Sequence, residues 1–559
     1  MSRLFRTLSR PGLSAGASAA GPSLPTDALV LLVCVWFAAT GNGAFWRGWL
    51  DGRALAEPGT WGTVAAVGLV LVALQFMLIA PFANRWTVRP LLALLVLVAA
   101  FAGYYIDRFG IVIDTSMLRN VLRTDVKEAR ELFAWALLPH LLLHAVPPLW
   151  LLWRVQPRRR PLAASWWRRV LAWLAVAAIG TAALLSVFQD AAATMRNQKA
   201  LRFLVTPANV AWSLAVVLGQ DTRTATRPRE AIGLDASRGP RASAPGRRPM
   251  RVVLVLGETA RAANWGLNGY ARQTTPRLAA LPDVIPFAQV TSCGTNTEVS
   301  VPCLFSPWGR RQYDEARIRG SQTLLHVLHR AGVQVFWRDN QSGCKGVCDG
   351  LPNETVSAAT APGFCDGERC FDEGLLQGLD ARLSSLPAGD QFVVLHQLGN
   401  HGPAYDRRYP DAFRRFVPVC DTADLRRCSR EQIVNAYDNA LLYTDHVLAQ
   451  AIEWLRRASA SHDTVLLYVS DHGESLGENG LYLHGLPYAL APDEQTRVPM
   501  LVWFSDAFAT GQHLDLACVR QRAAKPASHD HLFHSVLGLL DVSTRLHDPA
   551  MDLFGACRR

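Results

Sequence analysis

The stretch Thr291-Ser-Cys-Gly-Thr-Asn-Thr-Glu-Val-Ser-Val-Pro-Cys303 is dense in hydroxyl groups and is bracketed by two cysteines. It follows an extended, apolar run at residues 284–290. From Asn296 onward it can open a helix, because Asn caps helix starts and Glu suits the first turn. A hydroxyl there meets backbone N–H groups that favour a phosphate. The residues alone leave several nucleophiles open, and they also allow an ordinary capped turn with a structural Cys293–Cys303 bridge. The candidate hydroxyls are those of Thr291, Ser292, Thr295, Thr297 and Ser300.

Apolar residues crowd the first 220 positions in long runs, whereas the remainder has the mixed texture of a globular domain. With 559 residues, 50% of them hydrophobic, the chain is too long for one domain and too apolar for a plain soluble enzyme. Its net charge of +11 comes from 57 Lys and Arg against 46 Asp and Glu, and many arginines lie in short loops and one linker. We therefore expect an anionic membrane surface as a partner and no nucleic acid.

Five apolar runs are predicted to cross a membrane, since each is close to the roughly 20 residues that a bilayer core requires. A basic N-terminal segment with Arg3, Arg6 and Arg10 precedes the first run, which we interpret as a signal anchor. The fourth run contains three prolines and two histidines, which we expect to face protein or a wet groove; a kinked structural helix is the alternative. The predicted spans are residues 28–46, 61–82, 90–106, 132–153 and 170–188.

Arginine-rich segments determine the predicted orientation. The N-terminus, the loop after the second span and the loop after the fourth span are basic, so we place them in the cytoplasm. An odd number of spans then exports everything after residue 188. The interrupted apolar stretch 203–218 is predicted to be an interfacial helix, and the Arg-rich linker 222–249 is expected to lie on anionic headgroups.

Ten of the 11 cysteines follow residue 290, and most of them occur as close pairs. Repeated close pairs indicate short-loop disulfides and an oxidising compartment, in agreement with the predicted export. Zinc-binding thiolates are the alternative, but a repeated Cys-x2-Cys spacing is absent. The close pairs are Cys293/Cys303, Cys344/Cys348, Cys365/Cys370 and Cys420/Cys428, and the remaining Cys518 and Cys557 can pair with each other.

From residue 250 onward, short strand-like runs alternate with longer helical stretches. This alternation predicts an α/β domain with a mainly parallel sheet between helices, in which ligands collect beyond the carboxyl ends of the strands. We therefore divide the chain into a five-span membrane domain (1–190), interfacial helices with a basic linker (191–249) and an exported α/β domain (250–559). The predicted strands are 251–256, 333–338, 391–397, 464–470 and 500–504, with helices at 321–331 and 430–459.

Carboxylate and imidazole residues follow three of these predicted strands. Carboxylate oxygen together with imidazole nitrogen suits zinc, with manganese as a lesser option. Each residue taken alone is explained as well by a helix cap or a loop histidine. Their joint occurrence at strand ends, beside small glycines, favours a metal site. The residues are Glu258, His396, His401, Asp471, His472 and His484.

Five motifs lie in the α/β part of the chain: VLGETAR at 255–261, SCGTNT at 292–297 followed by SVPC at 300–303, NHGP at 400–403, SDHGESLGENG at 470–480 and YLHG at 482–485. Together they resemble the lipid A phosphoethanolamine transferases, the family that includes the mobile colistin-resistance enzymes. That family belongs to the alkaline phosphatase and sulfatase superfamily. The resemblance covers nearly the whole chain, including the five predicted spans and residues 113–122, and implies an alkaline phosphatase-like fold for the α/β domain.

The resemblance also implies roles for individual residues. It makes Thr297 the nucleophile and places one tight zinc ion on Glu258, Thr297, Asp471 and His472. It assigns His401 and His484 to the phosphate or to a second, weaker zinc. It places Lys345 as a substrate-side cation, for which an exposed loop lysine is the alternative. His396 either supports this cluster or is structural.

The function implied by the resemblance is transfer of phosphoethanolamine from phosphatidylethanolamine to a lipid A phosphate through a covalent Thr297 intermediate. We expect a monomer in the bacterial inner membrane with its catalytic domain in the periplasm, and a product that binds polymyxin-type cationic peptides less well. The alternatives are transfer to a lipopolysaccharide core sugar or another glycan, and a non-catalytic membrane sensor. A sulfatase is disfavoured because the Cys/Ser-x-Pro-x-Arg sequence is missing from the nucleophile stretch, and the periplasmic disulfides count against a glycerophosphate polymerase.

Overall fold

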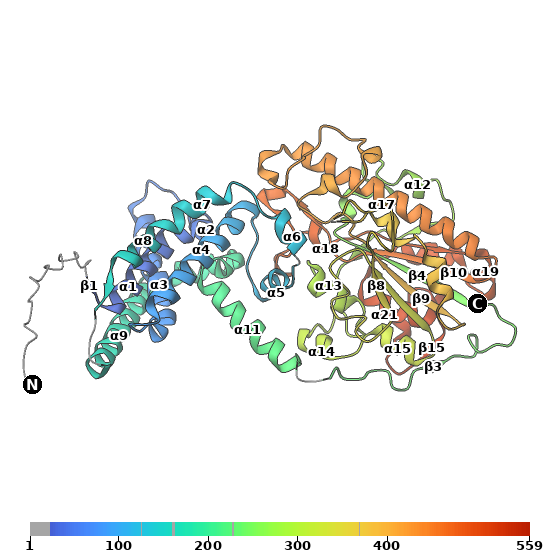
Figure 1. Cartoon of the computed structure of the whole chain (residues 1–559), viewed down its shortest axis with the longest axis horizontal. Helices are drawn as coiled ribbons and strands as arrows, with labels where there is room; N and C mark the ends of the chain where they lie inside the picture. Colours follow the sequence, from blue (N-terminus) through green and yellow to red (C-terminus); the bar gives the residue numbers. More distant parts are fainter. Residues whose placement is uncertain (1–22, 125, 159–161, 226–227, 368) are drawn as a thin grey trace, which may run out of the picture. The chain divides into compact units, whose positions relative to one another are not determined.

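The structure is a computed structural model that describes residues 23–124, 126–158, 162–225, 228–367 and 369–559 (Figure 1). The chain divides into two compact units. Unit 1 comprises residues 1–103, 138–198 and 205–208, and unit 2 comprises residues 104–137, 199–204 and 209–559. Several arginines that support the predicted signal anchor and orientation lie outside the described residues, namely Arg3, Arg6, Arg10, Arg159 and Arg160.

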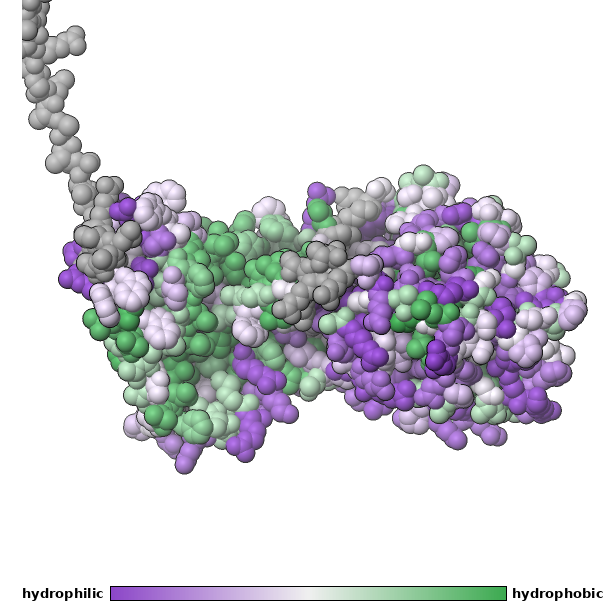
Figure 2. Space-filling view, turned by 90° about the horizontal axis from the view of Figure 1, so that it is seen from below, coloured by the Kyte–Doolittle hydropathy of each residue, from purple (hydrophilic) through white to green (hydrophobic). Residues whose placement is uncertain are grey.

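Unit 1 is helical. Side chains such as Leu29, Phe37 and Phe76 form its buried apolar core, and α3 packs along α9. Figure 2 shows that apolar residues also dominate the visible surface of this unit, whereas the surface of unit 2 is mostly polar. The elements are α1 (Thr26–Trp36), a π-helical turn (Phe37–Gly41), α2 (Gly43–Leu50), α3 (Pro58–Ile79), most of α4 (Val88–Phe109), α7 (Leu137–His144), α8 (Val146–Arg154), α9 (Leu162–Ser186) and α10 (Phe188–Asn197).

Three helices are long and apolar enough to cross a membrane: Pro58–Phe82, Val88–Phe109 and Trp166–Ser186. A fourth span results if Thr26–Gly41 and Gly43–Leu50, which are bent by 59°, count as one. The predicted count of five is therefore not confirmed within the described ranges.

The predicted span at 132–153 is not one helix but two short ones, α7 and α8. Pro147 and Pro148 lie in the first turn of α8, where the missing N–H groups cost nothing. In the interior of one continuous helix the same prolines would each remove a hydrogen bond. The prolines thus divide the apolar run 132–153 into two helices, where its hydropathy predicted a single one.

Unit 2 contains a seven-stranded sheet in the order β5-β13-β10-β4-β9-β7-β8. Four of its six pairings are parallel, and the two at the β5 edge are antiparallel, so the predicted mainly parallel sheet is a mixed one. Each predicted strand is present within about one residue at each end. The strands are β4 (Met250–Gly257), β5 (Ile285–Pro286), β7 (Gln334–Asp339), β8 (Asn353–Thr355), β9 (Gln391–His396), β10 (Asp463–Ser470) and β13 (Met500–Phe504).

Helices cover both faces of this sheet (Figure 1). Along β4, Val252 and Leu254 point into one apolar cluster and Val253 and Val255 into the other, as alternation along a strand requires. The first cluster includes side chains of α15 and α21, and the second includes those of α17. The helices are α12 (Pro276–Ala279), α13 (Thr297–Leu304), α14 (Glu315–Gly320), α15 (Leu324–Arg330), α16 (Leu379–Ser384), α17 (Arg430–Ala458), α18 (Asp493–Thr496), α19 (Asp506–Gly511), α20 (Leu516–Ala523) and α21 (Asp530–Leu539).

Residues 104–137 group with the catalytic sheet although two predicted spans flank them. Their helices α5 (Thr115–Arg123) and α6 (Val126–Glu131) are held to the rest of unit 2 by ion pairs. The fully buried Arg119 pairs with Glu315, and Glu131 pairs with Arg408. Helix α11 (Ala208–Ala225) lies mostly in the same unit, and its apolar part, Ala208–Gly219, is shorter than a typical span.

The basic linker makes contacts that were not predicted from the sequence. Its described arginines pair with carboxylates of unit 2. Asp390, which is almost fully buried, binds two of them and also accepts a hydrogen bond from Met250 N at the start of β4. The pairs are Arg229–Asp349, Arg238–Asp390, Arg247–Asp390, Arg241–Asp541 and Arg248–Asp463.

Five disulfides are present, in agreement with the cysteine spacing. The free cysteine among the described residues is the buried Cys34. The bridges join Cys293–Cys303, Cys344–Cys348, Cys365–Cys370, Cys420–Cys428 and Cys518–Cys557.

Replacing Asp390 by Asn should lower the thermal unfolding temperature of the full chain in detergent. The neutral amide leaves Arg238 and Arg247 without their counter-charge, at a cost of about 2–3 kcal/mol for these partly buried cations. The control is Arg545→Ala, whose side chain is 93% exposed beside Asp235 and should leave the unfolding temperature unchanged. Equal shifts in both variants would contradict a stabilising role for Asp390.

Candidate metal centre and nucleophile

The site begins where two neighbouring strands end. β4 and β10 run parallel with Gly257 paired to Ser470, so that Glu258 and Asp471 leave the sheet side by side. The backbone N–H of Asp471 donates to the carbonyl oxygen of Gly257 at 2.9 Å and holds the two ends together. Both carboxylates are fully buried. The register of one strand pair therefore places two acidic groups in one enclosed space.

Thr297 is the first residue of α13 and faces this space. Asn296 caps the helix by accepting from Val299 N, as the sequence predicted. The Thr297 hydroxyl donates to Glu258 Oε2 at 3.2 Å and lies 3.4 Å from His472 Nε2. The other candidate hydroxyls are engaged elsewhere or exposed: Ser292 donates to Gly294 O, Thr295 to Leu486 O and Ser300 to Asp471 O, while Thr291 is exposed.

The imidazole of His472 is held in one tautomer. Its Nδ1–H donates to the carbonyl oxygen of Gly473 at 2.9 Å, which turns Nε2 toward the two carboxylates. Nε2 lies 3.3 Å from Glu258 Oε1 and 3.3 Å from Asp471 Oδ2. A backbone carbonyl that orients a histidine in this way is typical of metal sites in proteins.

Burial and mutual repulsion dominate the electrostatics of this cluster. Burial, and then the charge of Glu258, raises the pKa of Asp471 to about 6. Burial acts to lower the pKa of His472, but the two carboxylates outweigh it and raise that pKa to about 10. Burial likewise acts to raise the pKa of Glu258, yet the hydrogen bond and charge of His472 bring it below its ordinary value. The enclosed acids thus depend on a positive charge.

These residues fit a metal ion. Ligand atoms of Glu258, Asp471 and His472 all lie within 4.8 Å of one another. Asp471 Oδ2 is buried and has no hydrogen-bond partner among the described residues, although a buried carboxylate oxygen ordinarily has one. A cation bound at this point would satisfy that oxygen and offset the repulsion between the two acids. The cluster is therefore a possible metal site.

The other predicted histidines surround the cluster. The ring of His484 lies 4.3 Å from that of His472 and 5.5 Å from that of His401, measured between centroids. His484 donates from Nδ1 to Glu474 at 2.7 Å. His396 ends β9, binds Asp339 through Nδ1 at 2.8 Å, and places Nε2 4.0 Å from Glu258. The structure thus brings all four histidines to one edge of the sheet.

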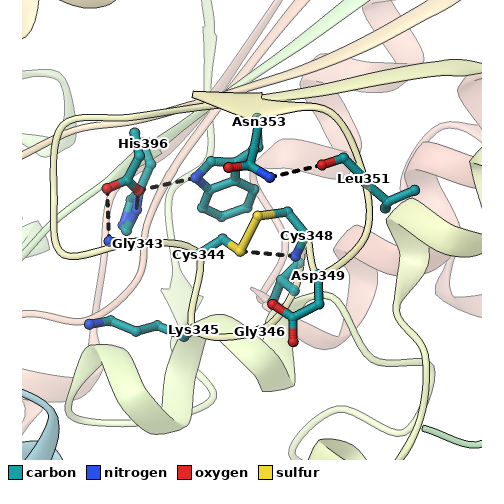
Figure 3. The surroundings of a disulfide bond; sticks show 12 residues. Gly343, Cys344, Lys345, Gly346, Cys348, Asp349, Leu351, Asn353 and His396 are labelled. Carbon is teal, nitrogen blue, oxygen red and sulfur yellow. Dashed lines mark hydrogen bonds and ion pairs between the residues drawn. A yellow bond between two sulfur atoms is a disulfide. The ribbon is translucent and has the colours of Figure 1, made fainter. Parts of the chain in front are cut away.

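Lys345 lies on the loop that the Cys344–Cys348 disulfide closes, and Figure 3 shows its side chain pointing away from the disulfide. Its ammonium group donates to Ser342 Oγ at 2.6 Å and pairs with Glu298 at 3.4 Å. Glu298 directly follows Thr297. Lys345 is therefore a buried cation one residue away from the nucleophile candidate, and not an exposed loop lysine.

Several residues that shape the site were not predicted from the sequence. His529 accepts from Cys293 N and donates to Ser470 O, so it links the nucleophile loop to the end of β10, and burial lowers its pKa to about 3. Glu474 was quoted within a motif but received no role. Gln341 donates to Glu258 at 3.3 Å. Among these residues, only Glu474 could have been found from the local sequence, because it belongs to the motif that begins with SDHGE at residue 470.

Two family models match the chain: Sulfatase over residues 251–542 and Phosphoethanolamine transferase EptA/EptB over residues 71–222. Phosphoethanolamine transferase EptA of Escherichia coli (strain K12) is 39% identical over 548 residues, covering 96% of this chain and 98% of the relative. The chain belongs to the phosphoethanolamine transferase family. The family predicted from the motifs is thereby confirmed.

Two further members of the phosphoethanolamine transferase family extend the comparison. Phosphatidylethanolamine transferase Mcr-1 of Escherichia coli is 38% identical over 483 residues, covering 85% of this chain and 89% of the relative. The solved integral membrane lipooligosaccharide phosphoethanolamine transferase A (EptA) of Neisseria meningitidis has a TM-score of 0.90 and 36% identity, covering 96% of this chain and 100% of that one. The predicted membrane protein with a periplasmic catalytic domain is confirmed by this family membership and by the apolar helices of unit 1.

Asp471→Asn should abolish tight metal binding by the purified full-length protein, because it removes the carboxylate whose free oxygen faces the cluster. Elemental analysis after dialysis measures the loss as a fall in bound metal per chain. Glu478→Gln is the matched control, since Glu478 is a nearby carboxylate that pairs with Arg261 outside the cluster. An unchanged metal content in Asp471→Asn would mean that the ion is held elsewhere.

Proposed function

We propose that this enzyme transfers phosphoethanolamine from phosphatidylethanolamine to a phosphate group of lipid A. The observation that carries the proposal is the contact of the Thr297 hydroxyl with Glu258 and His472 in a chain of this family. A hydroxyl is a weak nucleophile by itself and needs a base or a metal beside it. The relatives named as phosphoethanolamine transferases support the donor group, and the solved lipooligosaccharide phosphoethanolamine transferase of Neisseria meningitidis supports a lipid A-type acceptor.

We further propose that the ion is zinc, held by Glu258, Thr297, Asp471 and His472. Zinc favours four such ligands at about 2.0–2.1 Å in a tetrahedron, whose edges are then about 3.3 Å. Four distances among Glu258 Oε1, Thr297 Oγ1, Asp471 Oδ2 and His472 Nε2 are 3.3–3.4 Å. When bound, zinc would lower the pKa of the Thr297 hydroxyl and polarise the phosphoryl oxygen. His401 and His484 remain candidates for the phosphate or a weaker second ion.

In the first displacement, the bond from Thr297 Oγ to phosphorus forms and the bond from phosphorus to the diacylglycerol oxygen breaks. The hydroxyl proton of Thr297 leaves along its hydrogen bond to Glu258. A proton must reach the departing oxygen, because an alkoxide is a poor leaving group. The chain then carries phosphoethanolamine on Thr297.

His484 is the better proton donor for that departing oxygen. Burial holds the pKa of His401 well below its ordinary value, so His401 is neutral at neutral pH. His484 instead donates from Nδ1 to the buried carboxylate of Glu474 at 2.7 Å, which fixes the orientation of the ring. Its Nε2 can then carry the proton that the leaving group takes. We therefore assign this proton to His484.

In the second displacement, an oxygen of the lipid A phosphate attacks the phosphorus, and the bond to Thr297 Oγ breaks. The attacking oxygen is already anionic, so this step needs no base. Thr297 Oγ takes back the proton held by Glu258, and His484 is reprotonated from water, so the site is restored. The product phosphate carries an added ammonium group, which reduces attraction for cationic peptides.

The finer architectural predictions belong to the same proposal. We propose five membrane crossings, with α7 and α8 together forming the fourth, and the domain limits 1–190, 191–249 and 250–559. We also propose that the enzyme acts as a monomer in the inner membrane. Both substrates are lipids, which explains why a catalytic domain of this type is attached to membrane helices.

Thr297→Ala should slow diacylglycerol release from fluorescent phosphatidylethanolamine by at least about 100-fold. The reason is that no other described hydroxyl of residues 291–303 faces the cluster. The measurement uses full-length protein in detergent, with lipid A supplied and mass spectrometry of the acceptor. Thr291→Ala is the control and should retain activity, since Thr291 is exposed. Unreduced release by Thr297→Ala would refute the nucleophile. Diacylglycerol release in the wild type without modified lipid A would point to a core sugar or another glycan as acceptor.

His484→Gln should slow diacylglycerol release by about 100-fold, within the range of general acid catalysis. It should slow the release of p-nitrophenol from p-nitrophenyl phosphoethanolamine far less, because that group departs without a proton. His401→Gln serves as the comparison and should not show this dependence on the leaving group. If His484→Gln slowed the reaction equally with phosphatidylethanolamine and with p-nitrophenyl phosphoethanolamine, His484 would act in binding and not in proton transfer.

A further inference from the structure

A cavity of about 1010 Å³ lies within unit 2 beside the nucleophile helix. Its wall includes Glu298 of α13, Arg319 of α14, Lys345 of the disulfide loop, Arg229 of the linker and Arg123 of α5. These segments are far apart in sequence and meet around one space. Glu298, the residue after Thr297, lines this cavity, whereas Thr297 and the residues of the metal cluster do not.

Cations outnumber carboxylates in this wall. Four cationic residues line it against Glu230, Glu298 and Asp349, which gives a net charge of +1. Glu298 is almost fully buried and gathers three of the cations: Arg123 at 3.0 Å, Arg319 at 3.3 Å and Lys345 at 3.4 Å. Because Glu298 follows Thr297 in the chain, it fixes these cations next to the nucleophile.

The arginines are paired but not saturated. A guanidinium group carries five N–H donors in a fixed fork that matches a phosphate. Arg229 uses Nη1 and Nη2 toward Gly346 and Asp349, and Arg319 uses Nε and Nη2 toward Glu315 and Glu298. Among the described residues, these contacts leave the Nε of Arg229 and the Nη1 of Arg319 for a ligand. Phosphate oxygens are the groups that such donors bind best.

We propose that this cavity binds the phosphorylated sugar headgroup of the acceptor, with Arg229 and Arg319 contacting phosphate oxygens. The inference rests on the proposed function and adds the acceptor site to it. The donor headgroup fits less well, since it carries an ammonium that a net positive wall repels, and its single phosphate must lie at Thr297. The volume also exceeds what phosphoethanolamine fills. The second displacement brings an anion toward an anionic centre, so cations on the acceptor side are required.

The test separates the two halves of the reaction in full-length protein in detergent. The diacylglycerol burst without acceptor reports the donor half, and the KM for bisphosphorylated lipid A reports the acceptor half. Arg229→Gln should raise that KM at least fivefold while changing the burst rate far less, and Arg229→Lys should raise it by a smaller factor. Arg241→Gln is the matched control, since Arg241 lies in the same linker and pairs with Asp541 away from the cavity.

An unchanged KM in Arg229→Gln would overturn the proposal, and so would a parallel fall of burst and transfer. If Arg229→Gln does not unfold cooperatively, and so is not properly folded, the KM of Arg229→Lys for lipid A is the test. The lysine keeps the charge but lacks the forked donors of arginine. Failure of the proposed function is a separate result: the wild type would then show a burst with no phosphoethanolamine on lipid A. A KM effect that is equal in Arg241→Gln would mean that linker charge in general, and not this cavity, attracts the acceptor.

Discussion

Two carboxylates enclosed in one buried space repel each other, and the site is built around that repulsion. Glu258 and Asp471 are brought together by the register of β4 and β10, which also buries them completely. Burial and the charge of Glu258 raise the pKa of Asp471 to about 6, so ionisation of both acids is opposed. His472 offsets part of the charge, and the Thr297 hydroxyl donates into the rest. The strand pairing therefore creates a need for a cation that the neighbouring residues satisfy only in part.

The sequence was informative wherever a local pattern decided the outcome. Apolar runs bounded by turn residues located the strands, and the residues just after them proved to be those of the cluster. The helix start at Asn296 followed from its cap. His529 could not be found in this way, because it contacts Cys293 and Ser470 across 236 and 59 residues and no short-range pattern reports such a contact. The same holds for the three cations around Glu298.

The less successful predictions concern segments whose structure depends on residues distant in the sequence or on details that composition does not show. Hydropathy predicted one span at 132–153, but it averages over composition and does not register that Pro147 and Pro148 suit a helix start. Charge counting likewise assigned the linker arginines to lipid. Asp390 and the other carboxylates that bind them are scattered through the later sequence, so the pairing emerges only from the fold. Composition gives the net charge of the chain, but it does not show which groups the charged side chains contact.

Helix α5 has a consequence for how the catalytic domain can be studied. Arg123 reaches Glu298 from this helix, and the end of the Met117 side chain occupies the space beside Gly485. A fragment that begins after the linker would keep the strand ends, the disulfides and Thr297, yet it would lack both of these contacts. Such a fragment would present an opened active site, with the wall beside His484 missing. Inhibitors selected against the isolated domain would therefore be fitted to a surface that the intact enzyme covers.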